Sequence, residues 1–148
     1  MWKEAYLANA VSADPMELVC LLYEHALDAV RDARQHLKSG DIAARGKAIC
    51  KAVAILGELS SSLDHNAGGT ISTNLEQLYS YMSLRLTEAN IRKQDAPLAE
   101  VESLLNTLGQ AWREAKAKQA AVVAAPVTPS PAVWQESQLE PVGHDWSA

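Results

Sequence analysis

The chain has 148 residues, of which 48% are hydrophobic, so it can form one domain with a sizeable core. Its 25 alanines and 18 leucines, with no phenylalanine, favour helices over sheets. A net charge of −5 argues against nucleic acid or an anionic membrane surface as the main partner.

Neither the cysteines nor the apolar runs indicate an exported protein. Two cysteines do not make a disulfide framework, and we expect Cys20 and Cys50 to be buried free thiols. The longest apolar run, residues 120–127, is far shorter than the roughly 20 residues that span a bilayer. The first 15 residues lack the apolar centre of a signal peptide. We therefore expect a cytoplasmic (cytosolic) protein without membrane insertion.

The first helix has a clear start and a clear end. Asp14 can cap it, Pro15 suits the first helical position, and Glu17 follows three residues after the cap. Gly40 is a typical stop. These signals predict a helix over residues 15–39.

The second helix begins after Asp41 and carries an unusually wide apolar stripe. Its core positions recur every seven residues, which is the spacing of bundle packing, and three further residues widen the stripe. The core positions are Ile42, Ile49, Leu56 and Leu63, and the widening residues are Val53, Ile55 and Leu59. We expect part of this stripe to form a binding groove. The alternative is that the same residues complete the core or a homodimer seam.

Two further helices follow after a loop predicted at residues 65–69. The third carries Ile71, Leu75, Leu78, Met82, Leu86 and Ala89 on its apolar face. Asp95, Ala96 and Pro97 restart the chain, and the fourth helix carries Leu98, Val101, Leu105, Leu108 and Trp112. The short connections predict an all-α fold, an antiparallel up-down-up-down four-helix bundle over residues 15–118.

The two ends of the chain do not share this periodicity. Residues 1–14 are too short for an independent helix, yet they carry Tyr6, Leu7 and Val11, which would prefer a groove to solvent. We expect this segment to be an N-terminal lid. Residues 119–148 are rich in proline and hold Trp134 and Trp146, and we expect a disordered tail.

No pattern indicates a catalytic, cofactor or metal site. No histidine follows a carboxylate by three residues, as a di-iron bundle would require. Residues 40–47 miss the phosphate-loop pattern, and no base or oxyanion site is defined for Cys20. Glu24, Asp28 and Asp32 form an acidic row that is a solvated face or a docking stripe. The sequence therefore favours a binding protein over an enzyme.

Three tyrosines are candidates for a partly solvent-exposed surface, because a tyrosine combines an apolar ring with a polar hydroxyl group. They are Tyr23, Tyr79 and Tyr81. The last two lie about 200° apart around one helix, so they cannot share a face. We expect one of them at the core edge and the other available to a partner.

A series of short segments, taken together and in order, resembles the FliS family of flagellar secretion chaperones. The segments are Leu18 to Tyr23, Glu58 to Asp64 followed by Gly68 and Gly69, Leu75 to Tyr81, Glu88 to Asn90, and Ala111 to Ala115, with Tyr6 and Ser12 to Pro15 before them. The resemblance covers about residues 5–117. The loop at 65–67 and the proline-rich tail depart from the family pattern.

The resemblance implies a cytoplasmic export chaperone. Such a protein binds the disordered C-terminal segment of flagellin, prevents premature polymerisation, and aids delivery to components of the flagellar type III export gate. The resemblance implies a lid that includes Tyr6, Leu7 and Val11. From the residues themselves we expect a client-binding groove that includes Leu18, Tyr23, Ile49, Val53, Leu56, Tyr79 and Tyr81. The alternative is a structural or regulatory helical bundle that homodimerises through its apolar groove.

Overall fold

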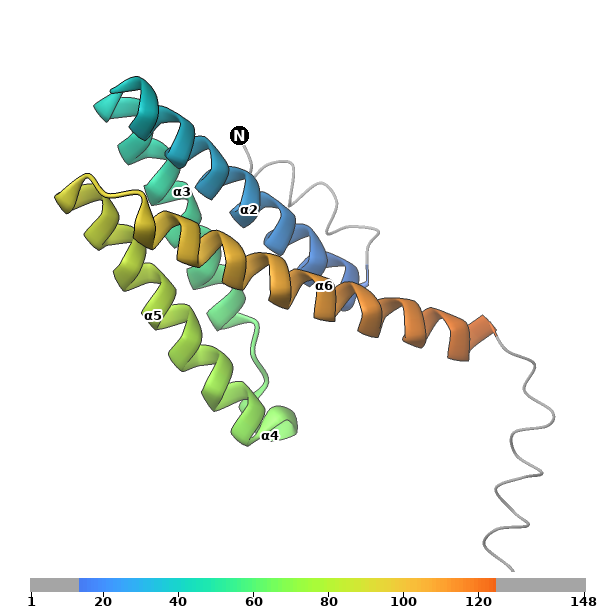
Figure 1. Ribbon diagram of the computed structural model, residues 1–148. Coiled ribbons are helices and arrows are strands. Elements are labelled where there is room, and N and C mark those ends of the chain that lie inside the picture. Colours follow the sequence, from blue (N-terminus) through green and yellow to red (C-terminus); the bar gives the residue numbers. More distant parts are fainter. Residues whose placement is uncertain (1–13, 125–148) are drawn as a thin grey trace, which may run out of the picture. The chain divides into compact units, whose positions relative to one another are not determined.

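The computed structural model describes residues 14–124, and every regular element among them is an α-helix. The helices are α2 (Pro15–Ser39), α3 (Ile42–Ser61), α4 (His65–Gly68), α5 (Thr70–Arg92) and α6 (Ala96–Ala124). The four long helices alternate in direction along the chain, which confirms the predicted all-α antiparallel bundle (Figure 1).

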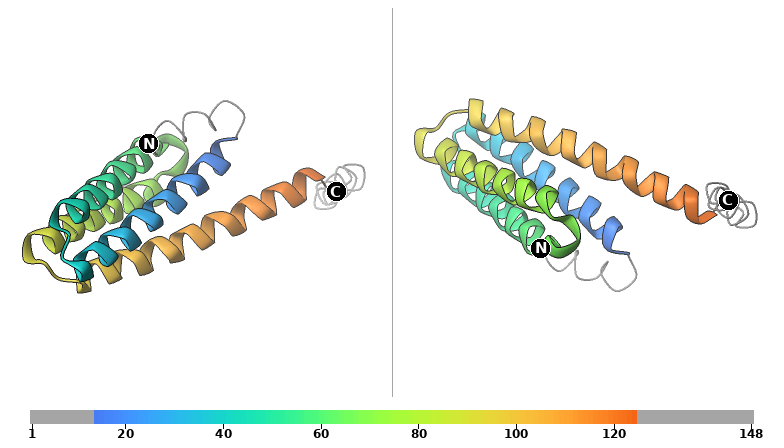
Figure 2. Two further views of the ribbon diagram at one scale, coloured as in Figure 1. Left: turned by 90° about the horizontal axis from the view of Figure 1, so that it is seen from above. Right: turned by 90° about the horizontal axis from the view of Figure 1, so that it is seen from below.

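The chain divides into two compact units, of which the first ends at Lys116. The packing described below concerns α2, α3, α5 and the part of α6 up to Lys116 (Figure 2). The predicted division of the chain at residues 14 and 118 stays a prediction. Residues 1–13 of the predicted lid and residues 125–148 of the predicted tail lie outside the described part of the chain.

Within residues 14–124, no helix combines the length and the apolar character that crossing a membrane requires.

The predicted start and end of the first helix are confirmed. The Asp14 side chain accepts a hydrogen bond from the Glu17 backbone N–H at 2.8 Å, and Pro15 follows as the first helical residue. Gly40 ends the helix with a φ of 79°, a left-handed conformation that glycine adopts without strain. Asp41 caps α3 in the same way as Asp14 caps α2, by accepting from the Ala44 N–H.

Two boundaries differ from the prediction. The predicted loop at residues 65–69 contains α4, because the Asp64 side chain accepts hydrogen bonds from the N–H groups of Asn66 and Ala67 and so starts a helical turn. In addition, α6 continues to Ala124, so residues 119–124 of the predicted disordered tail are helical. This segment is rich in alanine, the best helix former, and its first proline comes at residue 126.

The core draws large apolar side chains from all four long helices. Its largest members are Tyr23, Leu22, Ile55, Leu56, Leu59, Met82, Leu86, Leu98 and Leu105. Ile55 and Leu59, the residues that widen the α3 stripe, are therefore core, and Val53 is half-buried against the core. The wide stripe of α3 is largely explained by packing inside the bundle.

Two residues predicted in the core are exposed. Ile42 is the first residue of α3, and Ile71 is the second residue of α5; their side chains are 60% and 69% exposed. Both stand in the first turn of a helix, where fewer neighbouring residues cover a side chain. Cys20 is buried as predicted, whereas Cys50 is exposed, and both are free thiols.

Candidate functional site

A pair of buried tyrosines joins α2 to α5. The hydroxyl groups of Tyr23 and Tyr79 lie 2.5 Å apart, and their rings are tilted by 55° with centroids 6.4 Å apart. Burial raises the pKa of the Tyr23 hydroxyl, as does the neighbouring Tyr79, while a side-chain hydrogen bond with Trp112 of α6 opposes the rise. Three helices thus share one polar contact inside an apolar core, and both phenols stay neutral at physiological pH.

Half-buried apolar side chains pack against the core that contains this tyrosine pair. Val19 lies one turn before Tyr23, and Leu75 and Leu78 precede Tyr79 on α5. We define the apolar rim as the half-buried set Val19, Leu63, Leu75, Leu78, Leu108 and Trp112, all of which pack against the core. The rim takes apolar side chains from α2, α5 and α6 and, through Leu63, from the connection after α3, and all of them remain partly open to solvent.

The predicted site residues fall into three groups. Tyr6, Leu7 and Val11 lie outside the described residues. Tyr23, Ile49, Leu56 and Tyr79 are buried in the core, where a client cannot touch them unless the helices separate. Leu18 and Val53 are half-buried, and Tyr81 is exposed. The role of each in binding stays a prediction.

Tyr79 and Tyr81 face different environments, as their spacing predicts. Tyr79 is 2% exposed, whereas Tyr81 is 41% exposed and donates a hydrogen bond to Glu100 of α6 at 2.6 Å. Arg85 binds the other oxygen of Glu100 at 2.7 Å. Together, Tyr81 and Arg85 hold the pKa of the Glu100 carboxyl below its ordinary value. Tyr81 therefore already has a partner in α6.

An arginine clamp on α2 was not predicted. Arg34 donates to both carboxylate oxygens of Asp95 at 2.8 Å each and to Glu102 at 2.8 Å, and Arg31 also binds Glu102, at 3.0 Å. These hydrogen bonds lower the pKa of Asp95 and of Glu102. The clamp ties the α5–α6 connection and α6 to α2. The sequence identified Asp95 as part of the start signal of the fourth helix, but it gave no indication that Arg34 would bind this carboxylate.

Replacing Arg34 with glutamine should lower the free energy of unfolding at neutral pH, with a deficit that shrinks in acid. Carboxylates with depressed folded-state pKa values stabilise the fold above their unfolded-state pKa and lose this effect as pH falls through the folded-state pKa. The ordinary values are 3.8 for Asp95 and 4.5 for Glu102. Urea unfolding of both proteins should therefore show the full gap above pH 4.5, and the gap should close as the pH falls below 3.8 and through the depressed folded-state pKa values.

The matched control for this experiment is Arg113→Gln, which removes an exposed arginine from α6. Its unfolding free energy should follow the wild-type value at every pH. A deficit in Arg34→Gln that stays constant down to strong acid would show that the clamp acts through packing instead of charge.

A buried arginine, also missed, joins α3 to α5. Arg45 is only 4% exposed, and its Nε donates to the Asn90 Oδ1 at 2.9 Å. Its Nη2 reaches the backbone oxygen of Asn90 at 3.4 Å, near the C-terminal end of α5. One sequence signal was available, because Arg45 stands between Ile42 and Ile49 at helical spacing, on the core side of the stripe.

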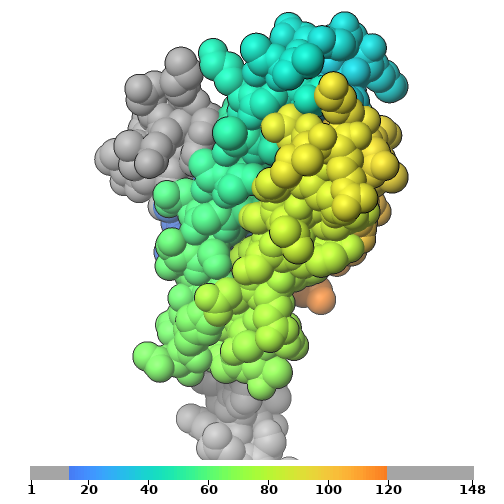
Figure 3. Space-filling model, turned by 90° about the vertical axis from the view of Figure 1, so that its left-hand side faces the viewer, coloured from blue at the N-terminus to red at the C-terminus, as the bar shows by residue number. Residues whose placement is uncertain are grey.

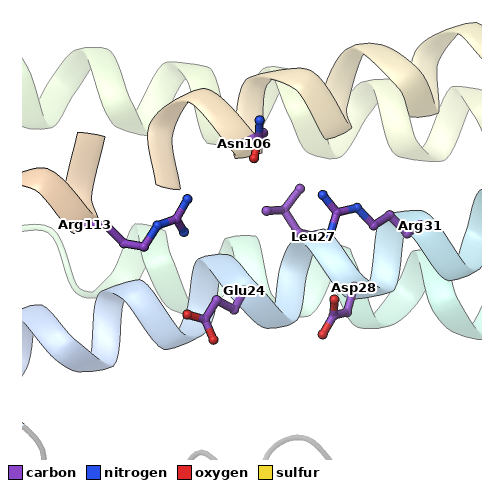
Figure 4. Close-up of a pocket in the computed structure, with 6 residues that line it drawn as sticks. All are labelled: Glu24, Leu27, Asp28, Arg31, Asn106 and Arg113. Carbon is purple, nitrogen blue, oxygen red and sulfur yellow. The ribbon is translucent and has the colours of Figure 1, made fainter. Parts of the chain in front are cut away.

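An open polar cleft of about 340 Å³ lies between α2 and α6. Figure 4 shows Glu24 and Asp28 on α2 with their carboxylates turned away from α6, while the guanidinium groups of Arg31 and Arg113 extend along the gap. Leu27 and Asn106 complete the lining. The lining holds no cysteine, serine or histidine.

The chemistry available elsewhere is similarly limited. Burial raises the pKa of the Cys20 thiol, so this sulfur is not an activated thiolate. Within residues 14–119, no group of three or more His, Cys, Asp or Glu side chains is placed to hold a metal ion.

Comparison with known proteins places the chain in a family. The model of the family "Flagellar protein FliS" matches residues 3–119. The flagellar secretion chaperone FliS of Salmonella typhimurium is 40% identical over 109 residues, which cover 73% of this chain and 81% of that protein. FliSB of Pseudomonas aeruginosa is 36% identical over 105 residues, 71% and 83% of the two chains.

A third relative gives a similar match. FliS of Bacillus subtilis is 35% identical over 112 residues, which cover 75% of this chain and 83% of that protein. All three relatives are named flagellar secretion chaperones, and none is named an enzyme. The chain therefore belongs to the FliS family and has a chaperone role in flagellar export.

Proposed function

We propose that this chain binds the disordered C-terminal segment of flagellin in the cytosol, prevents premature polymerisation, and helps deliver it to the flagellar type III export apparatus. Membership of the FliS family supports the chaperone role. The observation that carries the binding proposal is the apolar rim, whose partly open apolar side chains pack against the core that holds the buried tyrosine pair.

The rim suits a helical client. An amphipathic helix is bound by laying its apolar residues, spaced three, four and seven apart, onto a complementary apolar surface. Ordering a disordered client costs about 2–5 kcal/mol, so the contact has to be extended. The rim draws on α2, α5, α6 and the connection after α3, and so offers contacts over several helices.

The N-terminal segment is the proposed cover of the rim in the absence of client. Its apolar residues include Trp2, Tyr6, Leu7 and Val11. Leu18, in the first turn of α2, lies beside Val19 of the rim. Exchange of this lid for the client would keep apolar surface covered in both states, which favours solubility of the free chaperone. The loaded form is the proposed partner of the export gate.

Isothermal titration calorimetry of the full chain with a flagellin C-terminal segment tests the proposal. We expect binding in the micromolar range or tighter. Leu75→Ala removes part of the rim and should weaken binding about tenfold, the equivalent of about 1.4 kcal/mol. Leu63→Ala should act in the same direction, because both leucines lose apolar contact area with the client.

Leu37→Ala is the matched control, because Leu37 is also a half-buried leucine packed on the core but lies near the C-terminal end of α2, away from the rim. Its affinity should equal the wild-type value. Absence of binding at tens of micromolar would refute the flagellin proposal itself. Equal losses in Leu37→Ala and Leu75→Ala would instead refute the rim as the binding surface.

A further inference from the structure

One arginine of the bundle is left without a partner among the described residues. The chain has six arginines, all within residues 14–124, and five of them bond to an acceptor: Arg31, Arg34, Arg45, Arg85 and Arg92. Arg113 of α6 makes no hydrogen bond and no ion pair with another described residue. Its guanidinium is permanently charged and carries five N–H donors. These donors are available to a group from outside the bundle.

The position of the Arg113 guanidinium is set by the helix beneath it. Gly109, one turn earlier on α6, is buried, and a Cβ there would lie 3.4 Å from Arg113 Nη1 and 3.6 Å from Tyr23 Cβ. The Arg113 side chain is therefore folded back over the bare backbone of Gly109. A glycine inside a helix lowers stability relative to alanine. Here it leaves room both for the close approach of Tyr23 and for the guanidinium.

Two guanidinium groups meet in the polar cleft between α2 and α6. Arg113 and Arg31 enter the cleft from its two ends and point toward each other (Figure 4). Arg31 uses its Nε to bind Glu102 at 3.0 Å, so its Nη groups remain for another acceptor. Asn106 of α6 adds an amide to the same lining. Like charges that face each other repel, and an anion between them removes this cost.

A neighbouring pocket of similar size shows the contrast. It measures about 330 Å³, and its lining residues are Arg31, Arg34, Gln35, Lys38 and Glu102. In this second pocket, Arg34 binds both Asp95 and Glu102, so carboxylates of the bundle itself compensate the guanidinium charge. The cleft that holds Arg113 lacks such a carboxylate among the described residues, and it is therefore the better candidate for an external anion.

From this arrangement we infer that the cleft between α2 and α6 binds the C-terminal carboxylate of the client chain, an inference that rests on the proposed function. A carboxylate presents two oxygens in one plane, which matches the paired donors of a guanidinium. The α-carboxyl group at a chain end is ionised at neutral pH. The cleft volume of about 340 Å³ is near the lower end of the range for ligand clefts, about 300–1,000 Å³, and so admits a chain end.

The acidic wall of the cleft restricts what else can enter. Glu24 and Asp28 line the cleft with their carboxylates turned away from α6 (Figure 4), and Asp32 is exposed one turn further along α2. These three groups would repel a run of acidic residues lying along α2. A single carboxylate at the end of a chain reaches the guanidinium groups without adding charge along this wall. The site is therefore matched to a chain end and not to an acidic segment.

The cleft adjoins the apolar rim, which connects it to the client. On α6, Arg113 directly follows Trp112 of the rim, and Gly109 directly follows Leu108 of the rim. The proposed client is a C-terminal segment, so it brings a chain end to this part of the bundle. Binding of a terminal carboxylate is a recurring way to recognise a peptide. It would fix the register of a segment whose apolar contacts alone allow it to slide.

Calorimetric titration of the full chain with two forms of the flagellin C-terminal segment tests the inference. One form ends in a free carboxylate, and the other ends in an amide, which has no charge. We expect amidation to weaken binding to the wild-type chain about tenfold, and Arg113→Gln to weaken binding of the free acid by a similar factor. The two forms should bind Arg113→Gln with nearly equal affinity. High salt should narrow the difference seen with the wild-type chain.

Arg92→Gln is the matched control, because Arg92 is an exposed arginine of α5, which packs beside α3 (Figure 3) and does not line the cleft. It should distinguish the two forms as the wild-type chain does. The unfolding free energy of Arg113→Gln should equal the wild-type value, which separates lost affinity from lost fold.

Two results would overturn the inference and leave the flagellin proposal intact. The first is equal affinity of the free acid and the amide for the wild-type chain. The second is a loss of affinity in Arg113→Gln that is the same for both forms, because the cleft would then bind a side chain of the client. Absence of binding by either form would refute the flagellin proposal and this inference with it.

Discussion

A Tyr23→Ala variant should unfold with a free energy about 3–5 kcal/mol lower than that of the wild-type chain, the largest effect we expect from a single substitution. Tyr23 is fully buried, and it contacts both Tyr79 and Trp112. Its removal leaves a cavity between three helices and deprives two polar groups of a partner. Urea unfolding followed by circular dichroism, at one fixed protein concentration, measures the change.

Two further substitutions separate the packing of the ring from the hydrogen bond. Tyr23→Phe keeps the ring and leaves the Tyr79 hydroxyl without this partner, so it should lower the unfolding free energy by about 1–3 kcal/mol. The double variant Tyr23→Phe/Tyr79→Phe removes both hydroxyl groups and should recover part of that loss. Tyr81→Ala, at an exposed position, should cost far less than Tyr23→Ala. Equal losses at Tyr23 and Tyr81 would contradict the assignment of Tyr23 to the core.

The ends of α2 and the start of α3 could be predicted from the sequence because their signals are local. An aspartate side chain reaches N–H groups two or three residues ahead, and a glycine adopts a positive φ by itself, so neither depends on tertiary contacts. The short α4 was missed because Asn66, Gly68 and Gly69 favour a loop, whereas the cap from Asp64 holds one turn in helical form. The alternating direction of the four long helices could be predicted from their short connections.

The polar contacts between helices could not be predicted from the sequence. Arg34 meets Asp95 and Glu102 only because α2 and α6 pack at a particular rotation and offset. If Arg34 stood one residue earlier or later on α2, its side chain would point about 100° away around the helix axis. The same limit applies to the site. The tyrosines marked the right region of α2 and α5, but burial decided which side chains a client can reach, and burial depends on all four helices together.

Asn90→Leu should lower the unfolding free energy by about 2–3 kcal/mol, the second large effect we expect, because it removes the side-chain acceptor of a buried charge. The Arg45 side chain is nearly inaccessible to water, and its Nε bonds to Asn90. The guanidinium stays ionised even when buried, so it cannot escape the loss by becoming neutral. The urea-unfolding midpoint and slope of the two proteins give the difference directly.

A second-site change distinguishes this mechanism from a general disturbance of α5. Arg45→Met/Asn90→Leu replaces the charged donor and its acceptor with apolar groups of similar size, so the double variant should regain most of the stability lost in Asn90→Leu. Asn106→Leu, at an exposed asparagine of α6, should change the unfolding free energy by no more than about 0.5 kcal/mol. If the Met replacement gave no recovery, Asn90 would stabilise the bundle through the end of α5 and not through Arg45, because recovery depends on removing the unpaired guanidinium.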